Sequence, residues 1–313
     1  MKSKQYYNLF LIVSLLFVSI KSFGQAKVDD EIILKTRVLI VDEKFDEAEK
    51  ILNQSLKNVG NNASLQIRIY NNYVMLYVVN NDFDKALHYA NLIKASASKT
   101  GDKLDDAYSN FCFARIYLMN NLYDQTILYA NKALKDLENK PEENFLKSDI
   151  YRIIATCYAR QGEYTDEYKN YVLKQLYYIE KTNSVFDIYV TYTDLTVMYT
   201  ANYEKTKQQE DLEKASYYAE KSLDLVKTHK LPFYSAQAIV SAYNNFASFI
   251  NQYPYKNLSR EKRREIAKSF IDKAIAISEK ANIKNLQMFC YATHAEICDD
   301  NAKFGVIDHL DSV

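Results

Sequence analysis

Glycine and proline are scarce in this chain, with 5 and 3 copies among 313 residues. An average soluble protein carries about 12% of the two together. So few turn-forming residues exclude a collagen-like repeat, a linker-rich chain and the turn-rich architectures of all-β proteins. The few glycines are also too scattered to form the glycine-rich loops that cradle phosphates in nucleotide-binding proteins.

An excess of charge of one sign is lacking too, since 40 Lys and Arg residues balance 40 Asp and Glu residues. Neither a G-x-S-x-G nor an H-E-x-x-H motif occurs. Adjacent carboxylates such as Asp105 and Asp106 are more typical of helix starts, where they interact favourably with the helix dipole, than of acid–base catalysis. We therefore expect no enzyme activity and no cofactor.

One long apolar stretch, LFLIVSLLFVSI, runs from Leu9 to Ile20, and Lys2 and Lys4 precede it in the sequence. It is shorter than the ~20 residues that span a bilayer, and Ser22 and Gly24 suit cleavage by a signal peptidase. We interpret residues 1–24 as a signal peptide and expect an exported protein, periplasmic or secreted, without a membrane span after cleavage. An uncleaved N-terminal anchor is the alternative. Cleavage leaves a net charge of −3, which disfavours nucleic acid as a partner.

A pattern recurs along the rest of the chain: an aromatic residue, an acidic residue or Thr, any residue, a small residue, and then an apolar stripe with helical spacing. Its clearest copies read FDEAEKIL, FDKALHYA and YDQTILYA. The fourth residue of each copy marks an anchor position. The anchors are Ala48, Ala86, Thr126, Glu167, Ala215 and Ala267, and successive anchors lie 38 to 52 residues apart. Such separations indicate a helical repeat.

A second apolar stripe precedes the anchors. Tyr70, Tyr73 and Tyr77 lie 16, 13 and 9 residues before Ala86, and offsets of three and four place them on one helix face. Turn-forming residues such as Asn120–Asn121 separate the two stripes. Each unit is therefore expected to consist of two antiparallel helices joined by a tight turn.

These helix pairs resemble the tetratricopeptide repeat (TPR). The segment NLYDQTILYANKAL, from Asn121 to Leu134, is close to the family's second helix, and the stripe of Phe113, Ala114 and Tyr117 matches its first helix. The absence of Trp, the lack of a proline ending each unit and a period above ~34 residues depart from the family pattern. The resemblance implies an all-α, right-handed α-α superhelix (solenoid) of about six helix pairs, as in exported bacterial TPR-like proteins.

We expect residues 25–313 to form a single TPR-like domain, because a lone helix pair cannot bury its apolar face and stacked pairs can. The units are expected at residues 29–60, 67–100, 105–140, 146–182, 186–229 and 233–282, with a partial terminal unit at 284–313 that starts with a further first helix.

Five of the eight arginines fall at positions that, in the resembling family, line the concave groove along the first helices. They are Arg37, Arg68, Arg115, Arg152 and Arg160, which lie 11, 18, 11, 15 and 7 residues before their anchors. The same face carries Asn71, Met75, Phe111 and Thr156, and farther along Asn244 and Ser248. Arginine binds carboxylates through two parallel hydrogen bonds, so this groove is predicted to bind an acidic peptide or protein segment. The alternative is that these arginines pair with Asp and Glu of neighbouring helices and bind nothing.

The cysteines permit one weak hypothesis. Cys290, His294 and Cys298 are spaced four apart on one predicted helix, which makes them weak candidates for a zinc site. The favoured interpretation is a half-buried helix surface without a metal. The disulfide pairing of Cys112, Cys157, Cys290 and Cys298 stays open.

The sequence as a whole predicts a non-enzymatic, exported binding scaffold whose partner is an acidic protein or peptide. The alternative is a ligand-sensing module of a bacterial envelope signalling system, since the repeats are also similar to the sensor half of TPR-containing membrane regulators.

Overall fold

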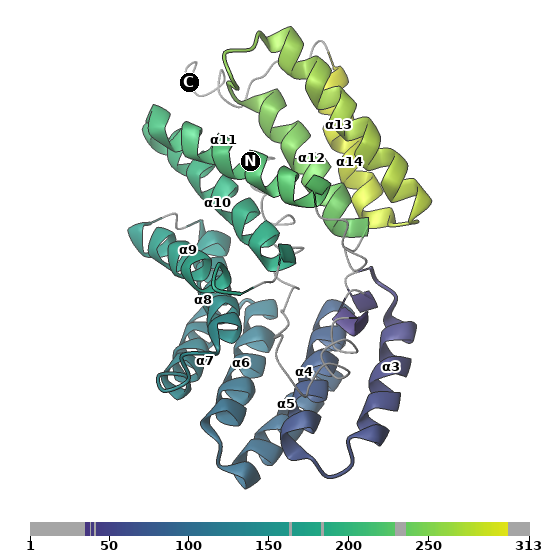
Figure 1. Ribbon diagram of the computed structural model, residues 1–313, viewed down its shortest axis with the longest axis vertical. Coiled ribbons are helices and arrows are strands. Elements are labelled where there is room, and N and C mark those ends of the chain that lie inside the picture. The colour runs from purple at the N-terminus through teal and green to yellow at the C-terminus, as the bar shows by residue number, and fades with distance from the viewer. Residues whose placement is uncertain are drawn as a thin grey trace. The chain divides into compact units, whose positions relative to one another are not determined.

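The computed structural model describes residues 35–37, 39–40, 42–162, 165–182, 185–228 and 236–299. Within these ranges every regular element is a helix and none is a strand (Figure 1). The predicted signal peptide and the chain after residue 299 lie outside them. The chain divides into two compact units between Asp194 and Leu195.

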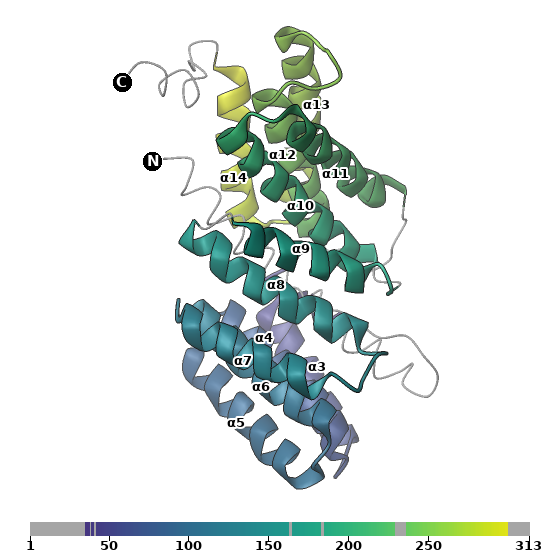
Figure 2. The same cartoon turned by 90° about the vertical axis from the view of Figure 1, so that its left-hand side faces the viewer.

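The N-terminal unit is a stack of helix pairs (Figures 1 and 2). Its helices are α3 (Phe45–Asn58), α4 (Ala63–Val79), α5 (Phe83–Thr100), α6 (Lys103–Met119), α7 (Tyr123–Asp136), α8 (Asn144–Gln161), α9 (Asp166–Ile179) and the first part of α10 (Val185–Thr206). The first helices of successive pairs, α4, α6 and α8, contact one another as well as their own second helices. We call the side of the stack that these three helices form the first-helix face.

The C-terminal unit continues the alternation. It contains the rest of α10, then α11 (Gln209–Thr228), α12 (Ala236–Gln252), α13 (Arg260–Lys280) and α14 (Lys284–Cys298). α14 contacts both α12 and α13, as the first helix of a further pair does.

Asparagine takes the place of glycine in the turns between α4 and α5 and between α6 and α7. Asn81 and Asn121 both adopt a φ of 57°, in the left-handed region that Asn tolerates better than most non-glycine residues. The Asp82 side chain then caps α5 by accepting a hydrogen bond from the main-chain nitrogen of Lys85 at 3.1 Å. Tight turns are therefore possible in a chain with so few glycines.

The second helices bury one stripe in a shared register, in which buried positions follow the first one by 4, 7 and 11 residues. The stripes are Ala48, Leu52 and Ser55 in α3; Ala86, Ala90, Ile93 and Ala97 in α5; Thr126, Ala130, Ala133 and Leu137 from α7; Tyr168, Val172, Gln175 and Ile179 in α9; Ala215, Ala219, Ser222 and Val226 in α11; and Ala267, Ile271, Ala274 and Ser278 in α13. Five of the six predicted anchors start these stripes and are 0% exposed, which confirms them as core positions.

The fourth anchor is wrong by one residue. Glu167 is exposed, and Tyr168 holds the buried position instead. The segment between α8 and α9 is one residue longer than those that precede α5 and α7. The stripe of α9 is therefore displaced by one position relative to the repeated sequence pattern.

An aromatic ring lies three residues after the first buried position of five second helices. These rings are Tyr89, Tyr129, Tyr171, Tyr218 and Phe270. Each contacts a ring on the first helix of its own pair, with centroid distances such as 4.2 Å for Tyr73–Tyr89 and 5.0 Å for Phe246–Phe270. Many of the 28 tyrosines thus serve packing between paired helices.

The first helices are buried on nearly all sides. In α4 every residue from Asn71 to Val78 is buried, because the helix is covered both by its own second helix and by the next pair. Polar side chains in the enclosed part of α4, such as Asn71 and Asn72, are consequently removed from water. Among the described residues, no helix has the length and apolar character needed to cross a bilayer.

The shared register predicts that Ala130→Leu destabilises the protein. Ala130 is 0% exposed in α7, so a larger side chain must displace its neighbours and lower the free energy of unfolding by about 1–3 kcal/mol. Leu128→Ala is the matched control, because Leu128 is 52% exposed and its loss should change stability by no more than about 0.5 kcal/mol. Denaturant unfolding measures both, and equal losses would contradict the buried stripe.

Candidate functional site

Three of the predicted arginines come together around a buried carboxylate, Asp149. The Arg152 Nη2 atom lies 2.7 Å from Asp149 Oδ1, and both side chains extend from α8, one helical turn apart. Arg115 on α6 and Arg37 in the helical segment 35–37 both act electrostatically on the same carboxyl group. We call Arg37, Arg115, Arg152, Asp149 and the nearby Asp187 the arginine cluster.

The side chains around the cluster hold the guanidinium groups in place. The Arg115 guanidinium carbon lies 4.4 Å from the centre of the Phe111 ring, which precedes it by one turn of α6. Its Nη1 atom donates a long hydrogen bond of 3.5 Å to Asn71 Oδ1. Arg37 Nε donates to Asn72 Oδ1 at 3.2 Å. Elements far apart in the sequence therefore meet at this cluster.

Burial governs the electrostatics of the cluster. Arg115 and Asp149 are each 3% exposed, and Arg152 is 4% exposed. Burial lowers the pKa of Arg37 to about 10, against the opposing effect of Asp149 and Asp187. Burial likewise raises the pKa of Asp149 to about 6, although Arg152 counteracts it. At neutral pH the Asp149 carboxyl group is thus mainly ionised, and the Arg37 guanidinium group stays protonated.

Two atoms of the cluster are left with unused hydrogen-bonding capacity. Arg115 Nη2 and Asp149 Oδ2 are both buried, and neither has a hydrogen-bond partner among the described residues. An unsatisfied buried donor or acceptor costs about 1–3 kcal/mol. The cluster therefore contains one buried donor atom and one buried acceptor atom that the described side chains leave unsatisfied.

Other residues predicted for the groove lie in the interior of the same helices. Met75 and Phe111 are 1% and 0% exposed. Thr156 is buried, and its hydroxyl donates to the main-chain oxygen of Arg152 at 2.9 Å. Asn71 also accepts from the Cys112 thiol at 3.3 Å. These residues support the cluster from within the helix packing.

The remaining two arginines lie on the same first helices. Arg160 Nη1 donates to the main-chain oxygen of Leu118 at 3.0 Å and to Asn121 Oδ1 at 3.4 Å, which ties the end of α8 to the end of α6. Arg68 is half-buried on α4, and its charge acts on Tyr108 of α6.

Asn244 and Ser248 lie on α12, in the C-terminal unit. Both are half-buried, and Gln252 Nε2 donates to Ser248 Oγ at 2.9 Å. The Asn244 Oδ1 atom is buried without a hydrogen-bond partner in the described part of the chain.

The candidate metal ligands lie on α14. Cys298 Sγ is 3.5 Å from His294 Nε2, which is 3.4 Å from Asp272 Oδ1 of α13. Across the ranges that the structure describes, no three His, Cys, Asp or Glu side chains are grouped so as to bind a metal. All four cysteines are free, and burial raises the pKa of Cys112, Cys157 and Cys290 to about 12.

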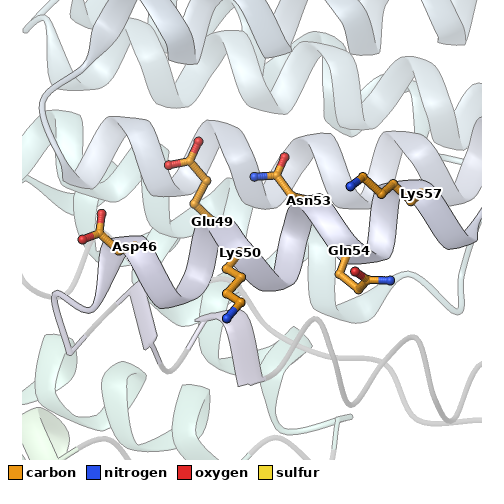
Figure 3. Close-up of a pocket in the computed structure, with 6 residues that line it drawn as sticks. All are labelled: Asp46, Glu49, Lys50, Asn53, Gln54 and Lys57. Atoms are coloured by element: carbon orange, nitrogen blue, oxygen red, sulfur yellow. The ribbon is translucent and has the colours of Figure 1, made fainter.

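A shallow pocket of about 340 Å³ runs along α3 (Figure 3). It is lined by Asp46, Glu49, Lys50, Asn53, Gln54 and Lys57. Two of these residues already bind the neighbouring helix, since Tyr73 donates to Asn53 at 2.8 Å and Tyr77 donates to Glu49 at 2.7 Å. All of its lining residues come from one polar helix, so the pocket is a weaker candidate than the arginine cluster.

Sequence reasoning missed the acidic members of the cluster, Asp149 and Asp187. Asp149 lies three residues before Arg152, so helical spacing could have paired the two. Asp187 lies in the first turn of α10, where an acidic residue suggests only a favourable contact with the helix dipole. Its electrostatic contact with Arg37 joins residues about 150 positions apart, and no local signal indicates it.

The fold is similar to that of solved helical proteins. No family model and no curated protein matches the chain. The apo form of RapI matches with a TM-score of 0.55 and 16% identity over 78% of this chain and 81% of that one. BtubC (BKLC) from P. vanneervenii matches with a TM-score of 0.54 and 14% identity, over 77% of this chain and 91% of that one. NprR in complex with its cognate peptide NprX matches with a TM-score of 0.54 and 16% identity, over 94% of this chain and 80% of that one. RapI and NprR are TPR-like helical solenoids, so the predicted fold class is confirmed.

The buried ion pair predicts that Arg152→Ala is strongly destabilising. The substitution leaves the Asp149 carboxylate without its closest counter-charge, which costs about 3–5 kcal/mol. Asp149→Asn in the same chain should recover most of that loss. Lys214→Ala serves as the control, because the Lys214–Glu210 pair is 41% and 72% exposed and is worth at most about 1 kcal/mol. Denaturant unfolding tests this series. Similar losses of unfolding free energy for Arg152→Ala and Lys214→Ala would refute the buried pair.

Burial also predicts how stability depends on pH. Burial raises the pKa of both Asp149 and Asp194 to about 6, so between about pH 4 and 6 the folded state binds more protons than the unfolded state. Their contribution to stability is therefore complete below about pH 4 and decreases as the pH rises to about 6. Asp149→Asn and Asp194→Asn should each flatten this part of the curve of unfolding free energy. If the variant with both Asp149→Asn and Asp194→Asn kept the wild-type dependence of unfolding free energy on pH, neither carboxyl group would be the source of that dependence.

Proposed function

We propose that this protein is a member of the TPR family that binds an extended peptide or protein segment along its first-helix face. One observation carries the proposal. Arg115, a member of the arginine cluster, keeps a guanidinium nitrogen without a partner. A protein that used these arginines for stability alone would have its buried donors satisfied.

The structural comparison supports a peptide as the ligand. NprR was solved in complex with its cognate peptide NprX, and it matches over 94% of this chain. A stack of helix pairs suits such a ligand, because successive units can present side chains at regular intervals along an extended chain.

The charge of the cluster supports an acidic partner. Arg37, Arg115 and Arg152 outnumber Asp149 and Asp187, so the first-helix face keeps a net positive charge at neutral pH. Arg68 and Arg160 add to that charge from α4 and α8. Arginine is suited to this role because its fork of donors matches a carboxylate.

We further infer that the protein is exported and acts by binding rather than by catalysis. The apolar segment that ends before Ser22 and Gly24 supports export. The arginine cluster consists of arginine and aspartate side chains without an activated nucleophile among them, which supports binding.

Arg115→Met is expected to weaken peptide binding by about 10–100-fold, since a hydrogen bond to a charged group is worth about 1.5–3 kcal/mol. Methionine keeps an apolar side chain over Phe111 and removes the guanidinium group. The measurement is fluorescence anisotropy with a pool of labelled acidic decapeptides and a basic pool for comparison. Binding of the acidic pool should also weaken as NaCl rises from about 50 to 500 mM.

Lys132→Met is the matched control for this experiment. Lys132 is an exposed cation on α7, a second helix, where its ammonium lies 4.5 Å from the centre of the Tyr129 ring. It is not a member of the arginine cluster. The Lys132→Met variant should bind the acidic pool like the wild type. Circular dichroism should show that both Lys132→Met and Arg115→Met are folded. Equal binding by Arg115→Met and the wild type would rule out the arginine cluster as the binding site.

A further inference from the structure

The two unsatisfied atoms of the arginine cluster belong to neighbouring first helices. Arg115 Nη2 comes from α6 and Asp149 Oδ2 from α8, and these helices are in contact. Arg115 and Asp149 interact electrostatically, yet each keeps one buried polar atom without a partner. A group that satisfies both atoms must accept a hydrogen bond from Arg115 and donate one to Asp149.

Charged groups satisfy only half of this requirement. A carboxylate accepts from Arg115 but is repelled by Asp149, which is ionised at neutral pH. An ammonium group donates to Asp149 but is repelled by the three arginines of the cluster. An amide is uncharged, and its oxygen accepts while its N–H donates.

We propose that Arg115 and Asp149 together bind an amide group of the peptide, so that the cluster distinguishes an amide from a carboxylate of the same shape. This inference rests on the proposed function, because a peptide must bring the amide to the first-helix face. The acidic residues of that peptide then lie beside this position, within reach of the net positive charge of the face.

Acetamide and acetate provide a test that needs no knowledge of the natural ligand, because they have the same shape and differ in one group. The readout is NMR of the intact protein at pH 7.5, with the guanidinium nitrogens of Arg115 and the carboxyl carbon of Asp149 assigned through Arg115→Met and Asp149→Asn. Acetamide should shift both signals saturably, and acetate should not.

Two variants control this experiment. Asp149→Asn removes the carboxylate that accepts from the amide, so the Arg115 signal should lose its response to acetamide and gain one to acetate. Asp194→Asn changes a half-buried carboxyl group of the same unit that lies outside the arginine cluster, and it should keep the wild-type preference.

A second arm uses peptides from the acidic pool that bind. Each Gln and Glu is exchanged for the other, one position at a time, and a parallel series carries N-methylated main-chain amides. If a side chain supplies the amide, Gln→Glu at one position should weaken binding by at least about tenfold, and Asp149→Asn should remove that difference. If the main chain of the peptide supplies the amide, N-methylation at one position should weaken binding by the same factor, and Asp149→Asn should remove that difference.

The outcomes separate the inference from the proposed function. Acetate binding at Arg115 in the wild type without acetamide binding would overturn the amide inference and leave an acid-binding scaffold. A response to neither probe would show that the pair holds only water, and it would also overturn the inference. Acetamide binding in a protein that binds no peptide would overturn the proposed function and leave the amide site standing.

Discussion

The second helices α5 and α7 bury their apolar stripes between the first helices on either side of them. α5 contacts both α4 and α6, and α7 contacts both α6 and α8. The small residues that start most of these stripes let the helices approach closely, and a lone helix pair has nothing to cover them. As a result, the middle parts of the first helices are enclosed, and charged groups there, such as Arg115, Asp149 and Arg152, are buried.

Enclosure of the first helices explains why the arginine cluster has its unusual form. A buried guanidinium group needs a counter-charge and hydrogen-bond acceptors. For Arg152 the counter-charge comes from the same helix, α8, because Asp149 lies one turn before it. Arg115 has less support, with a long hydrogen bond to Asn71 and the face of Phe111. The same helix packing thus satisfies one arginine and leaves its neighbour with an open nitrogen.

Local signals in the sequence predicted the helix pairs, the asparagine turns and the buried alanines, because spacing along one helix determines all three. Glu167 was misplaced because the longer turn before α9 moves the buried stripe by one residue, to Tyr168. The positions of Arg37, Arg115 and Arg152 were predicted, whereas their meeting at Asp149 and Asp187 was not. Such a meeting depends on how helices distant in sequence pack, and spacing within one helix carries no information about it.

A buried donor and a buried acceptor without partners reduce stability by about 1–3 kcal/mol each. On the outer helices comparable groups are satisfied at little cost, as when the Lys132 ammonium lies over the Tyr129 ring and remains in contact with water. If folding were the only requirement, apolar side chains of similar size in place of Arg115, Asp149 and Arg152 together would serve as well or better. The cost is offset when a ligand satisfies both atoms, so the two residues are better explained by recognition than by folding.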